Sequence, residues 1–583
     1  MTLPIGKGKF MKSVNYHHTQ LPGETGKLLR GITAQWLIGI RESNPAILDM
    51  FRDRDRRPYR DMLPWSGEFA GKYLTGAAYV YRITGNPELY DYIQKFIEEL
   101  LLFQDEEGYL GCYSKECRLT GAYSTAPTEY NQTWDAWNHY HCMFGLLQWY
   151  DLTGNQTYFC SIEKAAALFM RSFFGQKKTL LSIGWPEMNL AVYHIFAILY
   201  RRTGKEEYLR FAQMVENDIE TEGAGKYMYY ALRGYPYYKC PKPRWESLHA
   251  IMGYAEMYRS TGQERYREAL LQIFYSILKT DVHNTGAFST NEQAIGDPCR
   301  NGRIETCCVV AYNALAIEAF GLTGDLRIID FLERAHYNAV LGCYSPTGRW
   351  STYHTPMEGN KCANFQSINF QCRPGSPELN CCSVNAPRGV AAVGDWWLTR
   401  QENKLFLNFY EDAELETDLG ERVTIAGGYP ASSVVHITVE GLQDSHSMLL
   451  RIPAWSTHTK VQIGETCYYP QAGSYWELPC EETKTVVTVS FDFTPCIEKG
   501  SGDYTGRSSV YIGPVLYGFD VGDNEIFWEE LPAISGKSLT GLTPKRHEDG
   551  SIRLNLPEGI VLKDFYHLGA SGSWYSSWLP IEE

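Results

Sequence analysis

Two pairs of adjacent cysteines stand out among the 16 cysteines of the chain, Cys307-Cys308 and Cys381-Cys382. Neighbouring cysteines rarely bridge each other, because a disulfide needs its two Cα atoms further apart than one peptide link comfortably allows. The carboxylate of Glu305 precedes Cys307 by two residues. Together with the pair Cys381-Cys382, these side chains would offer one oxygen and three sulfurs to a tetrahedral zinc ion. Structural zinc sites space their cysteines two to four residues apart, so the adjacency favours a reactive site.

Core packing is the competing explanation for these pairs. Free cysteine is among the most buried residue types and behaves as a small apolar side chain. In a chain with 16 cysteines, some adjacency arises by chance. From the residues alone, metal binding or catalysis and core packing therefore stay equal alternatives.

Both cysteine pairs are expected at the start of helices. Residues 309–320 are apolar at helical spacing, so Glu305 and the first pair open a helix. After the second pair, Asn385 is the expected cap and Pro387 falls in the first turn. The N-terminal end of a helix lowers the pKa of a thiol, and a metal lowers it further. We therefore expect a thiolate nucleophile at neutral pH.

Other candidate site residues carry weaker signals. Glu292 precedes Glu305 by 13 residues and is a candidate general acid/base, although it is one of 68 acidic residues. His139, His141 and His249 lie near expected helix starts, where they would contact either substrate hydroxyls or polar groups within the helical part. The chain has no Gly-x-Ser-x-Gly elbow, Walker loop, Gly-x-Gly-x-x-Gly or His-Glu-x-x-His motif, which argues against serine hydrolases, nucleotide binding and zinc proteases.

Length and composition limit the class of protein. A chain of 583 residues is too long for one core, so two or more domains are expected. The net charge of −14 argues against nucleic acid or an anionic membrane as a partner, and no stretch is expected to span a bilayer. The segment Met1–Lys7 lacks the features of a secretory signal, so we expect a cytoplasmic protein with free thiols. Its 41 tyrosines and 15 tryptophans suit either sugar-binding surfaces or a large helical core.

A repeated Thr-Gly pair organises the first part of the chain. Apolar residues at helical spacing precede these pairs, and glycine ends helices because it accepts the left-handed conformation. The intervals of 50 to 69 residues fit two helices with their loops, and such hairpins either stack or close into a ring. We expect a closed ring of about six hairpins, an (α/α)6 barrel. The pairs are Thr84-Gly85, Thr153-Gly154, Thr203-Gly204, Thr261-Gly262 and Thr323-Gly324.

From about Asn403 the chain changes to alternating, β-branched segments separated by Gly and Pro turns, as residues 404–409, 433–439 and 485–491 illustrate. This pattern is typical of an antiparallel β-sandwich. The expected division is a barrel over residues 1–402 and a β-sandwich region over residues 403–583.

The motifs resemble glycoside hydrolase family 127, the β-L-arabinofuranosidases, in family order over nearly the whole chain. The separated Glu305-Thr306-Cys307 and Cys381-Cys382 are the specific part of the resemblance. The supporting stretches are residues 64–72, 108–111, 289–292 and 513–518.

The resemblance implies a role for each matching residue. Glu305, Cys307, Cys381 and Cys382 match the family's zinc ligands. Among them, Cys381 matches the nucleophile, while Glu292 matches the general acid/base. His249 resembles a sugar-contacting histidine. The chain departs from the pattern at Cys308, an extra thiol beside a ligand. It also departs at Trp185, which stands where some relatives have histidine and which leaves the exact sugar open.

We therefore expect a zinc-dependent retaining exo-glycosidase that releases β-L-arabinofuranose from an oligosaccharide or glycoside substrate. In this scheme Cys381 is the nucleophile and Glu292 the acid/base. Two alternatives stay open. One is an epimerase or lyase on the same barrel with a structural zinc, and the other is a non-catalytic carbohydrate-binding protein. The linkage, the aglycone and the choice between monomer and homodimer are also left open.

Overall fold

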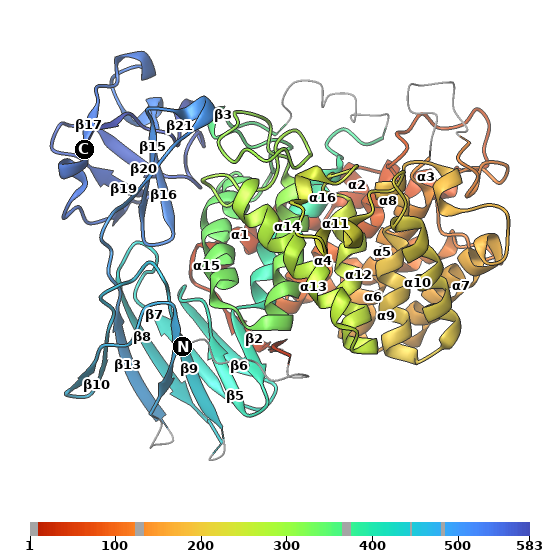
Figure 1. The fold of residues 1–583 in the computed structure, drawn as a ribbon, viewed down its shortest axis with the longest axis horizontal. Helices are drawn as coiled ribbons and strands as arrows, with labels where there is room; N and C mark the ends of the chain where they lie inside the picture. The colour runs from red at the N-terminus through yellow and green to blue at the C-terminus, as the bar shows by residue number, and fades with distance from the viewer. Residues whose placement is uncertain are drawn as a thin grey trace.

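The computed structural model describes residues 10–14, 16–122, 133–363, 375–443, 446–479 and 484–582. A helical part is followed by β-rich parts, which confirms the predicted order of helices and sheets (Figure 1). The segment Met1–Lys7, interpreted above as lacking a secretory signal, lies outside the described residues.

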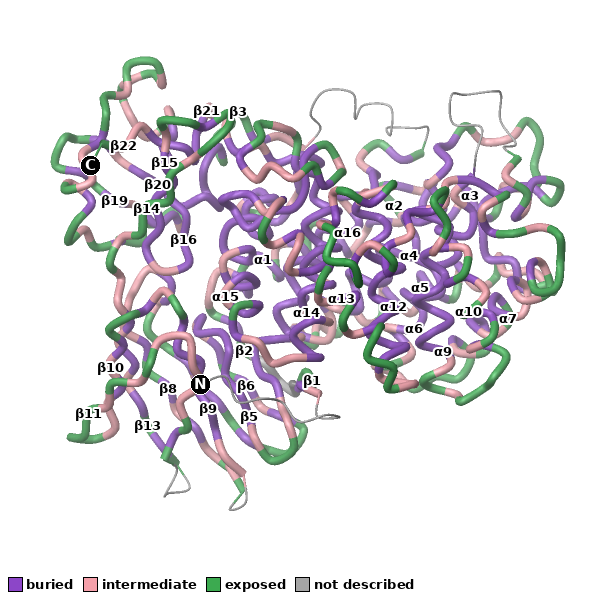
Figure 2. The backbone as a smooth tube through the Cα atoms, viewed as in Figure 1, coloured by how far each residue is buried: buried purple, intermediate pink, exposed green. Residues whose placement is uncertain are grey.

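The helical part is built on a closed ring of inner helices. Each inner helix packs against the next, and the last, α16, packs back against the first, α4. The inner helices are α4 (Glu68–Thr84), α6 (Asp135–Thr153), α9 (Val192–Thr203), α12 (Ser247–Thr261), α14 (Thr306–Thr323) and α16 (Cys381–Ala391). Figure 2 shows that their backbones are largely buried.

Outer helices cover this ring, and most follow their inner partners directly in the chain. They are α5 (Pro87–Leu102), α7 (Gln156–Phe173), α10 (Glu206–Ile219), α13 (Glu264–Thr280) and α15 (Leu326–Ala335), while α1 (Glu24–Ile32) packs on α16. Shorter helices in the connections are α2 (Ile40–Ser43), α3 (Ala46–Arg52), α8 (Pro186–Asn189) and α11 (Tyr227–Ala231).

The repeated Thr-Gly pairs end the inner helices as predicted. The glycines cap α4, α6, α9, α12 and α14 in the left-handed conformation, with φ between 58° and 69°. A side chain with a β-carbon is strained at such an angle, which explains the choice of glycine. The outer helix then begins within a few residues, and the side chains of Asn86, Asn155 and Asp325 cap α5, α7 and α15.

Helix α14 departs from the expectation that no segment is long and apolar enough to span a bilayer. By length and composition it passes that test over Thr306–Thr323. However, 83% of this window is buried inside the protein. The apolar residues on all sides of α14 therefore pack inside the protein, as expected for a helix at the centre of a core.

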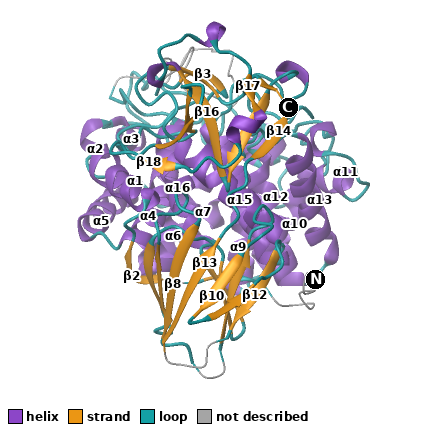
Figure 3. Cartoon of the chain, turned by 90° about the vertical axis from the view of Figure 1, so that its left-hand side faces the viewer, coloured by secondary structure: helices purple, strands orange, loops and turns teal. Residues whose placement is uncertain are grey.

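Two packed sheets follow the helices, in the lower part of Figure 1 and the lower front of Figure 3. One sheet has the strand order β11-β10-β13-β8-β7-β6-β2, and the other has the order β1-β4-β5-β9-β12. Burial alternates along β8, where Val435, Ile437 and Val439 face the core. One pair departs from the predicted antiparallel arrangement, because β5 and β9 run parallel.

The strands of these two sheets have the following bounds. They are β1 (Lys12–Ser13), β2 (Tyr16–Gln20), β4 (Leu398–Gln401), β5 (Lys404–Leu407), β6 (Ala413–Thr417), β7 (Arg422–Ala426), β8 (Val434–Glu440), β9 (Ser447–Ile452), β10 (Lys460–Ile463), β11 (Thr466–Tyr468), β12 (Ser474–Leu478) and β13 (Lys484–Ser490). The sheets thus begin at Leu398 and take in two strands from the start of the chain. The division at residue 403 stays a prediction.

A further sheet with its own apolar core lies beyond these two, in the upper part of Figure 3. Its strands are β14 (Cys496–Lys499), β15 (Ser508–Ile512), β16 (Val515–Asp520), β18 (Lys545–Arg546), β19 (Ile552–Asn555), β20 (Val561–Asp564), β21 (Trp574–Ser576) and β3 (Glu358–Asn360). Strands β17 (Ile534–Ser535) and β22 (Ile581–Glu582) pair separately. Because β3 comes from the loop before α16, this sheet is anchored to the helical part.

Candidate active site

A cavity of about 370 Å³ opens where the inner helices of the ring begin. Glu68 is the first residue of α4, Glu246 precedes α12, and Cys381 opens α16. The first turns of these helices therefore converge on one place. The cavity is lined by Trp65, Glu68, Trp134, Trp185, Met188, Arg244, Trp245, Glu246, Asn291, Glu292, Arg303, Glu305, Tyr353, His354 and Cys381.

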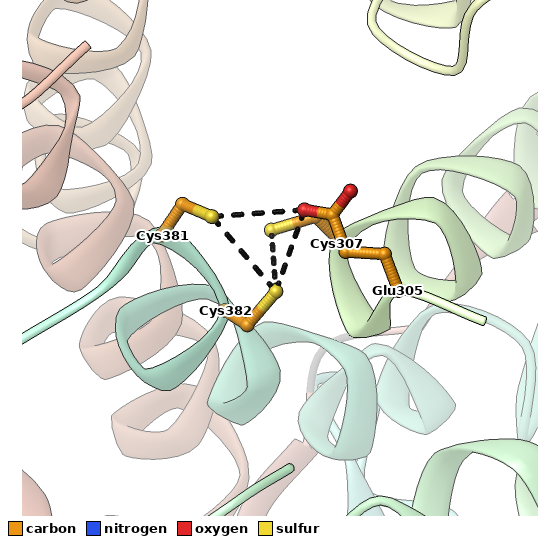
Figure 4. Close-up of side chains that lie close together, drawn as sticks. All are labelled: Glu305, Cys307, Cys381 and Cys382. Atoms are coloured by element: carbon orange, nitrogen blue, oxygen red, sulfur yellow. Dashed lines mark hydrogen bonds between the residues drawn. The ribbon is translucent and has the colours of Figure 1, made fainter. Parts of the chain in front are cut away.

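The predicted metal ligands come together beside this cavity (Figure 4). The sulfur of Cys382 lies 3.5 Å from the sulfur of Cys307 and 3.9 Å from that of Cys381. The Oε1 atom of Glu305 lies 3.6 Å from the Cys381 sulfur and 3.5 Å from the Cys382 sulfur. All four side chains are buried, and their donor atoms lie within 4.8 Å of one another. This cluster could hold a metal ion.

The spacing of these donors can be compared with a tetrahedral zinc site. Bonds of ~2.3 Å to sulfur place two sulfur ligands about 3.8 Å apart, and an oxygen ligand at ~2.0 Å lies about 3.5 Å from each sulfur. The sulfur separations of 3.5 and 3.9 Å and the oxygen–sulfur separations of 3.5 and 3.6 Å match this geometry. The donor set therefore fits zinc in both chemistry and size.

The two helix starts that carry these ligands have different caps. Glu305 is itself the cap residue of α14 and has an extended backbone. Helix α16 begins at Cys381, and Asn380 and Ser383 form a reciprocal capping box there. The predicted cap at Asn385 is wrong, because Asn385 and Pro387 both lie inside the helix. The helix starts earlier because the Asn380 side chain accepts the backbone N–H of Ser383 at 2.9 Å.

The surrounding groups of the protein shift the pKa values of the three thiols in different directions. Burial alone would raise the pKa of Cys307, but hydrogen bonds from Cys381 and Cys382 and the charge of Lys72 bring it well below its usual value. Burial raises the pKa of Cys381 and of Cys382 well above their usual value. Among these three thiols, a lowered pKa is thus found at Cys307, where the neighbouring thiols and Lys72 cause it. At Cys381 and Cys382 burial gives the opposite of the predicted lowering. Burial and then the charge of Glu292 raise the pKa of Glu305. These four donors can all be anionic together only with a further cation among them.

A buried ion pair supports the cluster from α4. The Nζ atom of Lys72 lies 3.0 Å from a carboxylate oxygen of Glu68 and 3.8 Å from the sulfur of Cys307. Both side chains of the pair are almost fully buried. Burial raises the pKa of Glu68 to about 7. Lys72 therefore supplies a fixed positive charge beside the sulfur whose thiolate form is favoured.

Cys381 and Glu292 line the same cavity, as a nucleophile and an acid/base must. The Cys381 sulfur lies 3.3 Å from the hydroxyl of Tyr353. Arg244 holds the Oε2 atom of Glu292 at 2.6 Å and also pairs with Glu246 at 2.6 Å. The backbone of Glu292 is left-handed, with φ of 67°. That conformation costs about 1–3 kcal/mol in a residue other than glycine, and such strain is concentrated at functional sites.

Indole rings form much of the cavity wall. The rings of Trp65 and Trp134 lie 5.1 Å apart, centre to centre. The buried indole N–H groups of Trp134, Trp185 and Trp245 have no hydrogen-bond partner among the described residues. An indole offers a flat apolar face together with one donor, which suits a sugar ring and its hydroxyls. Trp185 thus lines the cavity, and its predicted substrate contact stays a prediction.

The predicted histidines lie behind this wall. His141 and His249 pack edge-on against Trp137, with ring centres 4.4 and 5.0 Å away. Burial lowers the pKa of both imidazoles well below its usual value, so they are neutral. Each has an Nε2 atom without a partner among the described residues. Their predicted sugar contacts stay predictions.

His139 is engaged elsewhere. Its Nε2 atom accepts the backbone N–H of Leu110 at 3.0 Å, and its Nδ1 atom lies 2.9 Å from the backbone oxygen of Asp135. Both ring nitrogens are thus engaged, and His139 supports the backbone of Leu110. Its predicted sugar contact stays a prediction. Within the described part of the chain, His354 is the histidine that lines the cavity. The cavity beside Cys381 is therefore not lined by the three predicted histidines, and the alternative of an epimerase or lyase stays open.

Several residues of the site carry no signal in the sequence pattern. Glu68 and Lys72 are four residues apart on a helix, a spacing that usually marks a surface ion pair. Arg244, Glu246 and Tyr353 lie in loops or before a helix, where only the fold brings them to the cavity. The stretch of residues 64–72, noted for its resemblance to the family, was the one indication that α4 contributes to the site.

An acidic and aromatic cavity of this size is typical of enzymes that act on carbohydrates. Comparison with known protein families then identifies the family to which the chain belongs. The profile described as the β-L-arabinofuranosidase, GH127 catalytic domain, matches residues 44–395. The chain belongs to this family, and it is a glycoside hydrolase.

Solved structures share its fold. One is described as the GH127 β-arabinofuranosidase BT3674, with 19% sequence identity, a TM-score of 0.77 and coverage of 99% of both chains. Another is Ara127N, a GH127 β-L-arabinofuranosidase from Geobacillus stearothermophilus T6, with 17% identity, a TM-score of 0.74 and coverage of 97% of this chain and 100% of the other. A third, described as a glycoside hydrolase, has 18% identity and a TM-score of 0.73 over 99% and 98% of the two chains. No curated protein matches the chain.

Proposed function

We propose that the protein is a zinc-dependent, retaining exo-glycosidase that releases β-L-arabinofuranose, with Cys381 as the nucleophile. One observation carries this proposal. Cys381 belongs to the cluster of metal donors and also lines the cavity that holds Glu292. A structural site would have its ligands closed off from substrate, whereas this sulfur faces the place where a sugar would bind.

Glu305, Cys307, Cys381 and Cys382 would hold the zinc. When bound, the ion supplies the positive charge that keeps the Cys381 sulfur in the thiolate form. Lys72 adds charge from behind Cys307, at 3.8 Å from its sulfur. The residues thus support a thiolate in a buried place, where burial alone would keep the thiol protonated.

The chemistry proceeds in two displacements. First, Glu292 donates a proton to the leaving oxygen while the Cys381 sulfur attacks the anomeric carbon, so that a carbon–sulfur bond forms as the carbon–oxygen bond breaks. Second, Glu292 accepts a proton from water, the water oxygen attacks the same carbon, and the sulfur leaves. Two inversions at one carbon give net retention. Arg244 orients the Glu292 carboxyl group between these steps.

The cavity supports action on a chain end. Its volume of about 370 Å³ lies at the small end of ligand pockets, so it suits one sugar and the first atoms of an aglycone. The indole donors of Trp134, Trp185 and Trp245 are available for sugar hydroxyls. The ring of inner helices and their outer partners supports the further inference that this part is the predicted (α/α)6 barrel.

No disulfide joins the described cysteines to one another. The proposed cytoplasmic location agrees with this, because a reducing compartment preserves the thiols that the mechanism needs. The partner we propose is a glycoside or oligosaccharide.

Methanolysis tests the proposal. An aryl β-L-arabinofuranoside in the presence of methanol should first give the methyl β-glycoside, because the sulfur-linked intermediate is opened from the face that the aglycone left. The α-glycoside as the first product would contradict the two-step route. No turnover of this sugar, with turnover of another furanoside, would contradict the proposed substrate.

A further inference from the structure

A second and larger cavity lies at the opposite end of the helical ring. Its volume is about 660 Å³. The same inner helices reach it with their later turns, since α4 contributes Tyr79 and Arg82 there and α16 contributes Arg388. Arg388 follows Cys381 by seven residues, or about 10 Å along the helix axis. This cavity is therefore separate from the active site and takes no part in the mechanism above.

The lining of this cavity is rich in positive charge. Among the described residues it contains six cationic side chains and three carboxylates. The cations are Lys12, Arg82, Arg201, Arg202, Arg259 and Arg388, and the carboxylates are Glu256, Glu318 and Asp395. An excess of arginine in an enclosed space attracts anions, because the surrounding low-dielectric walls focus the field.

Most of these arginines already have carboxylate partners. Arg82 lies 2.7 Å from Asp395, and Arg259 lies 2.6 Å from Glu318 and 2.7 Å from Glu256. Such pairs are expected near the ends of helices, where arginine also offsets the partial negative charge of the last carbonyls. Their carboxylate partners and their positions near helix ends therefore account for these arginines without a ligand.

Arg388 also lies in the last turn of its helix, α16, but unlike these arginines it has no carboxylate partner among the described residues. It is 4% exposed, yet no hydrogen bond or ion pair joins its guanidinium to any described residue. Its neighbours are the rings of Tyr79 and Phe144, whose centres lie 5.8 and 5.3 Å from the guanidinium carbon. A buried guanidinium that no carboxylate contacts is costly unless a ligand supplies an anion.

The other side chains that line this cavity indicate the chemical character of the rest of the ligand. Phe144, Leu147, Ile198 and Met252 give the cavity an apolar side next to Arg388. The volume exceeds what a bare inorganic ion would fill and falls within the range of sites for small organic ligands. We propose that this cavity binds a small organic anion, with its phosphate or carboxylate group on Arg388 and an apolar body against these side chains.

Calorimetric titration of the full-length protein tests this proposal. Phenyl phosphate and benzoate serve as anionic probes, and benzyl alcohol serves as the uncharged control. We expect one phosphate or carboxylate probe, or both, to bind with one molecule per chain and benzyl alcohol to bind at least tenfold more weakly. The relative affinity of phenyl phosphate and benzoate identifies which anionic group the site prefers.

Two variants assign the binding to this cavity. Arg388→Gln should weaken the binding of the anions by about tenfold or more, because it removes charge-assisted hydrogen bonds. Ala314→Phe lies on α14 and should fill the cavity without touching any charge. It keeps the proposal testable if Arg388→Gln does not fold. Absence of anion binding to the unmodified protein at millimolar concentration would overturn the proposal. So would unchanged binding in both variants, since the probe would then occupy another site.

Discussion

At the scale of single residues, the sulfur atom of Cys381 lies both among the metal donors and at the wall of the cavity. It lies 3.6 Å from the Glu305 carboxylate and 3.9 Å from the Cys382 sulfur, as a metal ligand would. It also lines the cavity that contains Glu292. The hydroxyl of Tyr353 lies 3.3 Å from the same sulfur.

Substitution of the acid/base tests its role separately from that of the nucleophile. Glu292→Gln should lower the rate on substrates with poor leaving groups by roughly 10²–10⁴-fold, because the leaving oxygen then departs without a proton. An aryl substrate with a good leaving group should lose much less in the first step. Steady-state and burst kinetics on both kinds of substrate measure this difference. Equal rates for variant and unmodified enzyme on both would remove Glu292 from the mechanism.

The pair Cys307-Cys308 offers a matched test of the metal site. Cys307→Ser should reduce the zinc content well below one ion per chain, because one of the three sulfur donors is lost. Cys308→Ser should retain zinc, since Cys308 lies outside the donor cluster although it is next in sequence. Elemental analysis of protein prepared under reducing conditions measures both. Zinc loss only in Cys308→Ser would contradict the ligand assignment.

The sequence predicts the donor cluster because two of its four members are adjacent and a third follows a carboxylate at short range. It predicts Glu292 only through the family resemblance. Lys72 and Arg244 escape prediction because lysine and arginine are mostly exposed, and nothing local marks these two as half or fully buried. The signal of His139 is ambiguous in the sequence, because a histidine near a helix start can bond the backbone as readily as a sugar.

At the scale of elements, the starts of the inner helices build the active site and their later turns build the second cavity. The active site and the second cavity both arise from one repeated unit. This unit is an inner helix that ends at a Thr-Gly pair and is followed by an outer helix. The repeat predicts the helices up to α14. It does not predict the bounds of α16, whose last residue is followed by alanine instead of a Thr-Gly pair.

Removal of the cap of α16 should affect stability and the site together. Asn380→Ala should lower the free energy of unfolding by about 1 kcal/mol, because the backbone N–H of Ser383 loses its acceptor. It should also weaken zinc binding, since both Cys381 and Cys382 lie in the first turn. Denaturant unfolding and a zinc competition assay measure the two effects.

A second capping residue provides the control. Asn155→Ala removes the cap of the outer helix α7, where the side chain accepts the backbone N–H of Thr157 at 3.0 Å. A similar loss of stability is expected there, with unchanged zinc affinity. If both variants kept the same zinc affinity, the start of α16 would not be positioning the ligands.

At the scale of the whole molecule, segments that lie far apart in the sequence pair with each other in the β-rich parts and join these parts to the helical ring. Strand β1, Lys12–Ser13, pairs with β4, Leu398–Gln401, across most of the chain. Local alternation in the sequence predicts that strands exist but contains no information on such pairing. For the same reason the parallel pairing of β5 with β9 could not be predicted.

A buried ion pair joins the ring to the sheets. Arg451 on β9 lies 2.5 Å from Glu333 on α15, and both side chains are fully buried. Arg451→Met should lower the free energy of unfolding by roughly 3–5 kcal/mol, because Glu333 is left as an unpaired buried charge. The double variant Arg451→Met with Glu333→Gln should recover part of this loss. Denaturant unfolding measures all three proteins.

An exposed pair serves as the control for this change. Arg327, which is 72% exposed, pairs with Asp325 at the start of α15. Arg327→Met should change the free energy of unfolding by no more than about 1 kcal/mol. Equal effects of the two arginine substitutions would contradict the role given to Arg451.

The most direct test of the central claim is to find where the sugar is attached during turnover. Glu292→Gln should slow the second displacement, so that an aryl β-L-arabinofuranoside with a good leaving group accumulates the covalent form. Peptide mass spectrometry after rapid acid quenching should then locate one anhydropentose on Cys381. The sugar on any other residue, or release of the α-anomer without a covalent form, would contradict the assignment of Cys381 as the nucleophile.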